Sequence, residues 1–420
     1  MTLRPLRPPL PVLIGTLALL LAGPARAEAI SLAAALAAAD DANIDLNSAR
    51  NAVKTAAAGL RSADTAPNPQ FSLNATQIQP GRLSTLGAGN VADTVARIDL
   101  PLERGGKRTA RVAAARADLA AAGADRGDVT RQVHAAVADA WFNLMASERR
   151  ATLYARIADS WQTGVGLARK QRDAGAISGG DLARQQVEAL RAAAARSQAL
   201  SDQREAQLQL AALIGQEAAA ATLTTLGDWP AASPIASEDP DDVANRRPDV
   251  RAALARVESA RRQLDGAHAL KHPDITAGVQ VQHAPGLLGV GDSVGLGLAF
   301  QLPVRNRYNG EVDAAGVALA EAEAQAAKAR ALAVADIITA RRAAAEAGAR
   351  RQSVDAELLP AARKAADTAE FAYKSGAIAL LDLLDARRTL QSVELAAIDA
   401  HADEARAIAR LTAAQATGDE

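Results

Sequence analysis

The 420-residue chain contains no cysteine, and this absence removes several classes of site. Disulfide frameworks and thiolate metal sites are excluded, as is a lipid anchor on an N-terminal cysteine of a processed chain. Aromatic residues make up only 2% of the sequence, and basic and acidic residues balance at 47 and 48. The balance leaves no basic excess to attract nucleic acid. The composition instead suits long helices that pack closely through small side chains and carry charged outer faces.

Long hydrophobic runs are also missing, except near the start of the chain. Residues 1–27 combine Arg4 and Arg7 with an apolar run over 12–22 and a small-x-small sequence at 25–27. This pattern predicts a secretory signal peptide over 1–27, with a retained interfacial anchor as the alternative. No later segment is a candidate transmembrane helix, so a processed chain that enters a membrane must do so as β-strands.

Side chains arranged for catalysis are absent as well. No combination of serine, histidine and acid stands out, and we expect neither an enzyme nor a bound cofactor. His268 and His272 lie one helical turn apart and could contribute to a zinc site, but two ligands leave such a site incomplete. Their position at the end of a predicted helix suits a cationic C-terminal cap instead. The glycine-rich run at 105–108 lacks the first glycine of a Walker motif, so we do not expect a phosphate loop.

What the chain does have is a pattern that occurs twice. Gly175 is followed six residues later by Asp181, and Gly376 is followed six residues later by Asp382. The two pairs are separated by the same offset, which is close to half the chain length. The sequence therefore predicts a tandem duplication with one helical hairpin turn in each half.

Each half has the same predicted order of elements: helix, strand, strand, long helix, turn, helix. Proline and glycine mark the ends of the helices, and period-two alternation marks the strands. The first repeat, 28–215, has these elements at 31–66, about 70–79, 93–102, 107–173, 175–182 and 181–214. The second repeat, 246–420, has them at 248–270, about 274–283, 293–303, 310–374 with a bend at Pro360, 376–385 and from Leu383 onward. A linker or equatorial segment rich in proline, aspartate and alanine, 216–245, joins the repeats.

The four predicted strands each have one apolar face and one small or polar face, as strands of a membrane sheet or of a soluble sandwich do. Bacterial barrels begin at about eight strands and open edges are not tolerated in lipid, so several copies must combine if these strands enter a membrane. The helices at 31–66 and 181–214 together match the length of the helix at 107–173 and could run alongside it, end to end. This is the geometry of a helical tube below a barrel. A soluble periplasmic coiled-coil scaffold or adaptor protein is the alternative.

Three motifs carry a resemblance to a known family. The first is Leu100-Pro101-Leu-Glu-Arg-Gly105-Gly106-Lys107-Arg108, directly after a predicted strand. The second is the equivalent run Leu302-Pro303-Val-Arg-Asn306-Arg307-x-x-Gly310, and the third is Arg247-Pro248-Asp249-Val250. On these motifs the chain resembles the TolC-like outer-membrane efflux family, of the cobalt-zinc-cadmium resistance type, over essentially its whole processed length.

The resemblance implies a mainly α-helical fold with a membrane β-barrel contribution. Three chains would form a homotrimer, with a twelve-strand barrel in the outer-membrane lipid of a Gram-negative bacterium above a periplasmic α-helical barrel. The implied partners are a periplasmic adaptor (membrane fusion) protein and an inner-membrane pump of the resistance-nodulation-division class. The implied function is export of divalent heavy-metal cations, and a multidrug efflux duct of the same fold is the alternative.

The second hairpin turn carries the residues that the resemblance places at the pore constriction. Asp382 and Asp385 match the family's Asp-x-x-Asp, and three copies of each would form rings of carboxylates that favour cations. Tyr373 and Asp181 match the pair that links neighbouring hairpins when the tip is closed. Ile378 stands where the family's best-studied member has an arginine, so a second link is absent here. The alternative is that Asp382 is a helix N-cap and Asp385 a first-turn carboxylate.

Glycines and leucines complete the expected site. The residues expected to form the hairpin tips and dock the adaptor are Gly175, Leu182, Gly376 and Leu383. Glycine permits backbone angles that other residues avoid. The bends from strand to long helix are therefore expected at Gly105, Gly106 and Gly310.

Overall fold

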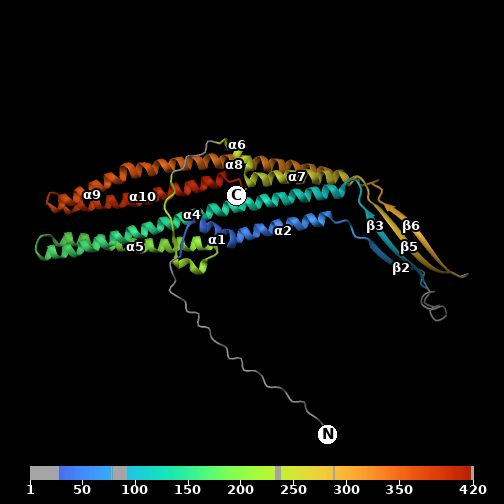
Figure 1. Ribbon diagram of the computed structural model, residues 1–420, viewed down its shortest axis with the longest axis horizontal. Coiled ribbons are helices and arrows are strands. Elements are labelled where there is room, and N and C mark those ends of the chain that lie inside the picture. The colour runs from blue at the N-terminus through green and yellow to red at the C-terminus, as the bar shows by residue number, and fades with distance from the viewer. Residues whose placement is uncertain (1–27, 77, 79–91, 232–237, 287–288, 418–420) are drawn as a thin grey trace, which may run out of the picture.

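The computed structural model describes residues 28–76, 78, 92–231, 238–286 and 289–417. The predicted signal peptide and nearly all of the loop expected between the first two strands lie outside these residues. The chain is elongated, with a four-stranded sheet at one end and two helical hairpin tips at the other (Figure 1). The order helix, strand, strand, long helix, turn, helix occurs twice, which confirms the predicted duplication.

The longest element is helix α4, Lys107–Asp173, which runs without interruption for 67 residues. Helix α2 (Ile44–Asp64) packs along the half of α4 nearer the sheet, and α5 (Gly179–Ile214) along the other half (Figure 1). Two shorter helices therefore lie beside one long helix, as the lengths predicted. Buried alanines such as Ala114 and Ala121 on α4 let the neighbouring helices approach closely.

The single helix predicted over 31–66 is wrong, because the chain breaks at Asn43. Helix α1 (Leu32–Ala42) ends there and α2 begins directly after it. The Asn43 side-chain oxygen accepts hydrogen bonds from the backbone N–H groups of Asp45 (2.9 Å) and Leu46 (3.3 Å). Its amide nitrogen donates to the Leu213 carbonyl at 3.0 Å. A buried asparagine thus caps the new helix with bonds that an unbroken helix would not offer it.

The second half contains α6 (Pro240–Arg246), α7 (Pro248–Ala269), α8 (Asn309–Ser353), α9 (Leu359–Lys374) and α10 (Leu380–Gln415). A π-helical turn, Val354–Leu358, joins α8 to α9 directly before Pro360. Proline has no N–H and its ring clashes with the carbonyl four residues back. The wider turn accommodates the proline, so the helix responds to Pro360, where a bend was predicted, by forming a local π-helical turn. None of the helices in the described part of the chain combines the length and the apolar composition needed to cross a bilayer.

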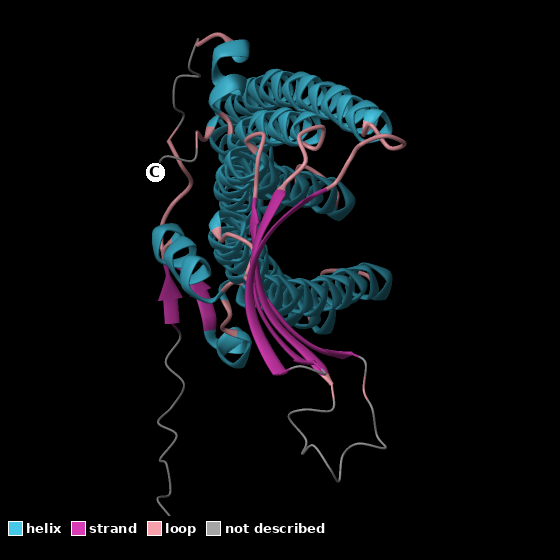
Figure 2. Ribbon diagram, turned by 90° about the vertical axis from the view of Figure 1, so that its right-hand side faces the viewer, coloured by secondary structure: helices cyan, strands magenta, loops and turns pink. Residues whose placement is uncertain are grey.

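The four long strands form one antiparallel sheet in the order β2-β3-β5-β6. They span Gln70–Thr76, Asp93–Leu102, Ile275–Gly286 and Gly289–Phe300. The last strand both begins and ends earlier than the predicted 293–303. Within the described part of the chain, strands β2 and β6 have only one neighbour each, so the sheet formed by these residues has two open edges. Figure 2 shows the strands bending together into a curved sheet.

The register places apolar side chains opposite one another on one face of this sheet. Ile98 pairs with Phe71 on one side and with Val279 on the other, and Val279 pairs with Leu296. These side chains are exposed, with Leu296 86% accessible. The other face is mostly small or polar, with serine, glycine, glutamine, two aspartates and one arginine among its side chains. An exposed apolar face of this size needs a cover of lipid or protein.

A second, two-stranded sheet was not predicted. Strand β1 (Glu28–Ile30) pairs in parallel with β4 (Leu223–Thr225), so a strand lies within the predicted linker or equatorial segment, 216–245. Figure 2 shows this small sheet at the flank of the helices. Trp141 of α4 donates its indole N–H to the Ile30 carbonyl at 2.9 Å. The Glu148 carboxylate accepts the Thr225 N–H at 3.1 Å, and burial raises the pKa of Glu148.

Candidate functional site at the hairpin tips

The two hairpin tips have the same backbone structure. Gly175 has φ 73° and Gly376 has φ 75°, values in the left-handed region that glycine adopts without strain. Both turns close with a backbone hydrogen bond of 2.8 Å from the residue after the glycine. The bonds run from Ala176 N–H to the Gln171 carbonyl and from Ala377 N–H to the Ala372 carbonyl. Each long helix thus ends in a glycine cap that satisfies its last carbonyls.

The start of α5 engages Asp181 closely. Ser178 caps the helix by accepting the Asp181 N–H at 3.1 Å, and its hydroxyl donates to the Asp181 carboxylate at 2.7 Å. Arg184 lies 3.3 Å from the same carboxylate. Among the hydrogen bonds of the described residues, none joins Tyr373 to Asp181. The local capping partners therefore hold Asp181 within this chain.

The structure at the start of α10 corrects the alternative prediction, in which Asp382 is the helix N-cap and Asp385 a first-turn carboxylate. Ala379 is the N-cap, so Asp382 is the third helical residue rather than the cap. Its carboxylate accepts the Ala379 N–H at 3.2 Å. Asp385 lies in the second turn, is exposed, and makes no hydrogen bond or ion pair with the rest of the described chain. Two carboxylates therefore stand exposed near the end of the molecule; Asp382 is hydrogen-bonded to the backbone, and Asp385 is held only by electrostatic attraction to Arg388.

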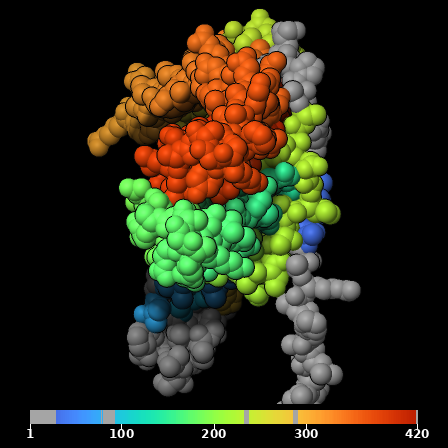
Figure 3. Space-filling view, turned by 90° about the vertical axis from the view of Figure 1, so that its left-hand side faces the viewer, coloured from blue at the N-terminus to red at the C-terminus, as the bar shows by residue number. Residues whose placement is uncertain are grey.

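A groove of about 830 Å³ separates the two hairpins at the tips. Its walls come from α4, α5, α9 and α10, and they include Trp161, Ile177, Tyr373, Leu383 and Arg387. Figure 3 views the molecule from this end, with the α4–α5 hairpin directly beside the α9–α10 hairpin. The groove lining mixes apolar side chains with charged ones such as Glu370 and Lys374, a mixture found at protein–protein interfaces.

The leucines expected to dock a partner are mostly hidden. Leu182 is 6% and Leu383 4% exposed, so both hold the hairpins together from inside. The large apolar side chains that a partner could reach near the tips are Leu167, Phe371 and Leu381, which are 59%, 75% and 57% exposed. Sequence reasoning missed these three. Whether these side chains are exposed depends on which face of each helix packs inward, and the sequence pattern of the two repeats does not determine that face.

One buried carboxylate fastens the two hairpins to each other. Glu188 of α5 is buried, and its oxygens lie 2.6 Å from Arg388 of α10 and 3.0 Å from Arg191. The hydrogen bond from Arg388 is the largest influence that lowers the pKa of Glu188 below its ordinary value. Farther along the hairpins, Arg150 pairs with Asp399 at 2.6 Å. These pairs fix the relative position of the two tips.

A further cluster lies on the second hairpin. Glu370 of α9 pairs with Lys374 at 2.8 Å and with Arg387 of α10 at 3.2 Å. The Arg387 guanidinium also lies over the Trp161 ring, 5.9 Å from its centre. The hydrogen bond from Lys374 leads the influences that lower the pKa of Glu370. The cluster joins α9, α10 and α4 at the level of the groove.

The bends from strand to helix differ between the repeats. Gly105 and Gly106 have φ 72° and 78°, as expected for glycine bends. In the second repeat the left-handed residue is Tyr308, with φ 58°, whose N–H donates to the Asn306 side chain at 2.9 Å. Gly310 lies inside the first turn of α8, so its predicted role as the bend is wrong. Asparagine supplies the turn bond that stabilises the strained tyrosine.

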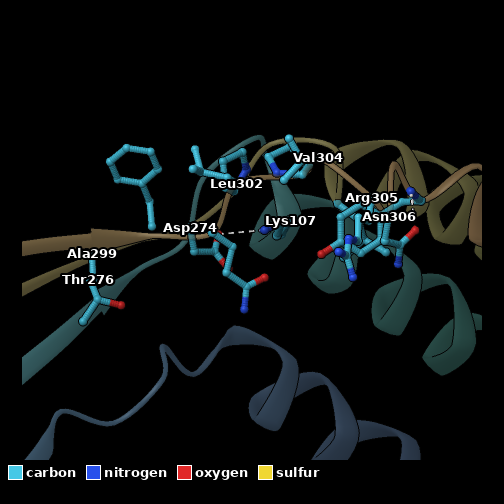
Figure 4. Close-up of a pocket in the computed structure, with 14 residues that line it drawn as sticks. Lys107, Asp274, Thr276, Ala299, Leu302, Val304, Arg305 and Asn306 are labelled. Atoms are coloured by element: carbon cyan, nitrogen blue, oxygen red, sulfur yellow. Dashed lines mark hydrogen bonds and ion pairs between the residues drawn. The ribbon is translucent and has the colours of Figure 1, made fainter.

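Figure 4 shows a cavity of about 640 Å³ beside this second bend. Lys107 of the first bend reaches across to Asp274, with Nζ 2.8 Å from Oδ1. His272 packs against Gly105, where an added Cβ would lie 2.7 Å from the His272 Cβ. No group of three His, Cys, Asp or Glu side chains among the described residues is placed to hold a metal ion. His268 and His272 therefore have no third ligand within the described chain.

A known protein family and individual proteins match this chain over most of its length. The family model for outer membrane efflux proteins matches residues 35–216 and 240–417. The chain is 27% identical over 373 residues to the cobalt-zinc-cadmium resistance protein CzcC of Cupriavidus metallidurans, covering 86% of this chain and 84% of that protein.

It is 30% identical over 301 residues to the pyoverdine export outer membrane protein OpmQ of Pseudomonas putida, covering 69% of this chain and 63% of OpmQ. A solved membrane protein from Pseudomonas aeruginosa superposes with a TM-score of 0.79 at 22% identity, over 91% of this chain and 90% of that one. The duplicated fold, the two-faced sheet and these matches agree. The chain belongs to the outer membrane efflux protein family and is an outer-membrane efflux channel with a periplasmic helical extension.

Proposed function

We propose that this channel is the exit duct of a tripartite efflux system that exports divalent heavy-metal cations. The observation that carries the proposal is the pair of exposed carboxylates, Asp382 and Asp385, at the start of α10. Rings of carboxylates lower the potential for cations at a constriction. The similarity to CzcC, whose name states cobalt-zinc-cadmium resistance, supports the same cargo.

The duct is a homotrimer in this proposal. Strands β2 and β6 leave two open edges, and open edges are not tolerated in lipid. Three copies joined β6 to β2 would form one closed twelve-strand sheet, with the exposed apolar face toward lipid and the polar face toward the lumen. The three pairs of hairpins would then surround a shared axis and bring three copies of Asp382 and Asp385 together.

The tip is the part that opens and closes. The closed state would place Tyr373 against Asp181 of a neighbouring hairpin, although Asp181 must then give up part of its bonding with Ser178 and Arg184. Ile378 offers no charged link at that level. The partners are a periplasmic adaptor protein and an inner-membrane pump of the resistance-nodulation-division class. The adaptor would dock at the tips through Leu167, which lines the groove, and through the exposed side chains of Phe371 and Leu381.

A second candidate cargo is an organic molecule. The similarity to OpmQ, named for pyoverdine export, favours this alternative over part of the chain. A deletion strain separates the two. We expect lower tolerance of zinc, cobalt and cadmium, restored by the intact gene, with unchanged tolerance of organic toxicants. Unchanged metal tolerance together with increased sensitivity to organic compounds would refute the metal assignment.

A further inference from the structure

The polar face of the sheet carries an ion pair that the tip does not explain. On β3, Arg97 Nε lies 2.8 Å from both carboxylate oxygens of Asp99, and Arg97 Nη2 lies 2.8 Å from Oδ1. Arg97 Nη1 also donates to the Gln280 side-chain oxygen on β5, at 3.4 Å. The side chains of Arg97 and Asp99 are 30% and 21% exposed. The pair therefore lies flat on the sheet instead of extending into solvent.

Glycines on the neighbouring strands form the floor beneath this pair. Asp99 is opposite Gly278 of β5, and Gly278 is opposite Gly297 of β6. A Cβ added to Gly278 would lie 2.7 Å from Arg97 Nη2 and still closer to an Asp99 oxygen. A Cβ added to Gly297 would lie 3.3 Å from Arg97 Nη2. Glycine in the interior of a strand weakens the strand, and it often marks a place where another group approaches the backbone closely. Gly278 and Gly297 lie side by side beneath the charged pair, so here the closely approaching groups are the side chains of Arg97 and Asp99.

The charges on this face are few. By register, the charged residues on the polar face of the described strands are Asp93, Arg97 and Asp99, so Arg97 is the one cation there. Asp93 pairs with Thr76 near the far end of β3, four residues from Arg97. His283 and Asp292 form a pair at 2.7 Å, but their register places them on the apolar face. Arg97 therefore has Asp99 as its ion-pair partner on the polar face.

We infer that Arg97 and Asp99 set the ion selectivity of the sheet end of the duct, with Arg97 masking the carboxylate of Asp99. This inference rests on the proposed trimer, in which the polar face lines the lumen. Three masked carboxylates would then circle the wall, and removing either partner would leave a ring of three unpaired charges. At the level of this pair, a wall whose charges cancel would let cations that pass the acidic tip leave without being retained at Asp99.

The test uses the purified full chain in planar bilayers, with reversal potentials measured across a gradient of low salt, where screening is weakest. Arg97→Gln should raise the cation-to-anion permeability ratio and Asp99→Asn should lower it, each by a factor on the order of two. The double variant should return to the wild-type ratio. A purely structural clamp would instead lower stability in both single variants and leave the ratio unchanged.

Because the chain has no cysteine, a single introduced cysteine can be labelled specifically. The same folded variant can then be given a positive or a negative charge by the choice of reagent. Arg97→Cys channels treated with a cationic thiosulfonate reagent should approach the wild-type ratio, and treatment with an anionic reagent should raise it further. Equal ratios after both reagents would overturn the inference, as would single variants that shift the ratio in the same direction. If the wild-type chain forms no conducting pore, the proposed duct fails and the inference fails with it.

Discussion

At the scale of single residues, the two tip aspartates differ in how firmly the chain holds them. Asp382 is tied to the Ala379 N–H, whereas Asp385 makes no hydrogen bond among the described residues and interacts with Arg388 only through the attraction of opposite charges. We expect Asp385→Asn to lower the cation-to-anion permeability ratio by about twofold, and to weaken block by multivalent cations, with no loss of stability. Asp382→Asn should do the same and also loosen the start of α10, because an amide lacks the negative charge that the helix dipole favours in the first turn.

The matched control is Asp367→Asn, which removes an exposed carboxylate on α9 away from the tip turn. Bilayer recordings on all three variants supply the comparison. If Asp367→Asn changes the ratio as much as Asp385→Asn does, the effect reflects overall charge, and the proposed rings are absent.

Glu188 should matter for stability in a way that depends on pH. Its bonds to Arg388 and Arg191 lower its folded-state pKa below the ordinary 4.5. Its contribution is therefore complete above the unfolded-state pKa and is lost as the pH falls through the lower folded-state pKa. Glu188→Gln should reduce the unfolding free energy by about 1–3 kcal/mol at neutral pH, since hydrogen bonds to charged groups have that magnitude.

Urea unfolding in detergent at pH 7 and at pH 3 measures this effect. The difference between wild type and Glu188→Gln should shrink at the lower pH. Glu346→Gln on α8, an exposed carboxylate without a partner among the described residues, should behave as wild type at both. A difference that is the same at pH 7 and pH 3 would show that the lost interaction is not ionic.

At the scale of elements, the hairpin turns depend on one backbone conformation. A Cβ at Gly376 would have nothing within 4 Å, so substitution costs backbone strain and not a clash. We expect Gly376→Val to destabilise the turn by about 1–2 kcal/mol, the cost of left-handed backbone for a residue with a side chain. Gly376→Asn should cost less, because asparagine tolerates this region. Metal tolerance of cells that carry each variant should follow the same order.

The equivalent change at Gly175 tests whether both hairpin tips contribute to stability and export. Gly175 has nearly the same φ and equally open surroundings, so Gly175→Val should lose stability to the same extent. If Gly376→Val and Gly376→Asn are equally impaired in export while both remain stable, the side chain itself obstructs docking and the strain account is wrong.

Elements repeated along the chain were predictable, and contacts between distant segments were not. The bounds of α4 followed from the absence of proline and from the glycines at both ends. Asn43 looked like any helical residue, because its cap depends on Leu213 lying beside it. The pairing of β1 with β4 left no local signal, since three-residue strands show no period. The tip aspartates followed from a motif, whereas Glu188 and Arg388 meet only once two hairpins are packed.

At the scale of the whole molecule, the open edges of the sheet make a direct prediction. Ser72 lies on β2 and Ser293 on β6, the two strands that have a single neighbour. In the cysteine-free chain, a Ser72→Cys, Ser293→Cys variant treated with a short bismaleimide should give covalent dimers and trimers on a denaturing gel. The control pair, Ala96→Cys with Val281→Cys, lies on adjacent strands of one sheet and should cross-link only within a chain. A purely monomeric product from the first pair would contradict the proposed trimer.

The pairing of β1 with β4 has a consequence for how the protein is made. Residues 28–30 find their partners at 223–225 only after more than half of the chain has been synthesised. Closing so long a loop is slow compared with forming a helical hairpin. If the chain crosses the inner membrane from its N-terminal end, its first strand waits unpaired until the middle of the sequence emerges. During that interval the strand needs protection from pairing with other chains, which makes this segment a natural client of periplasmic chaperones.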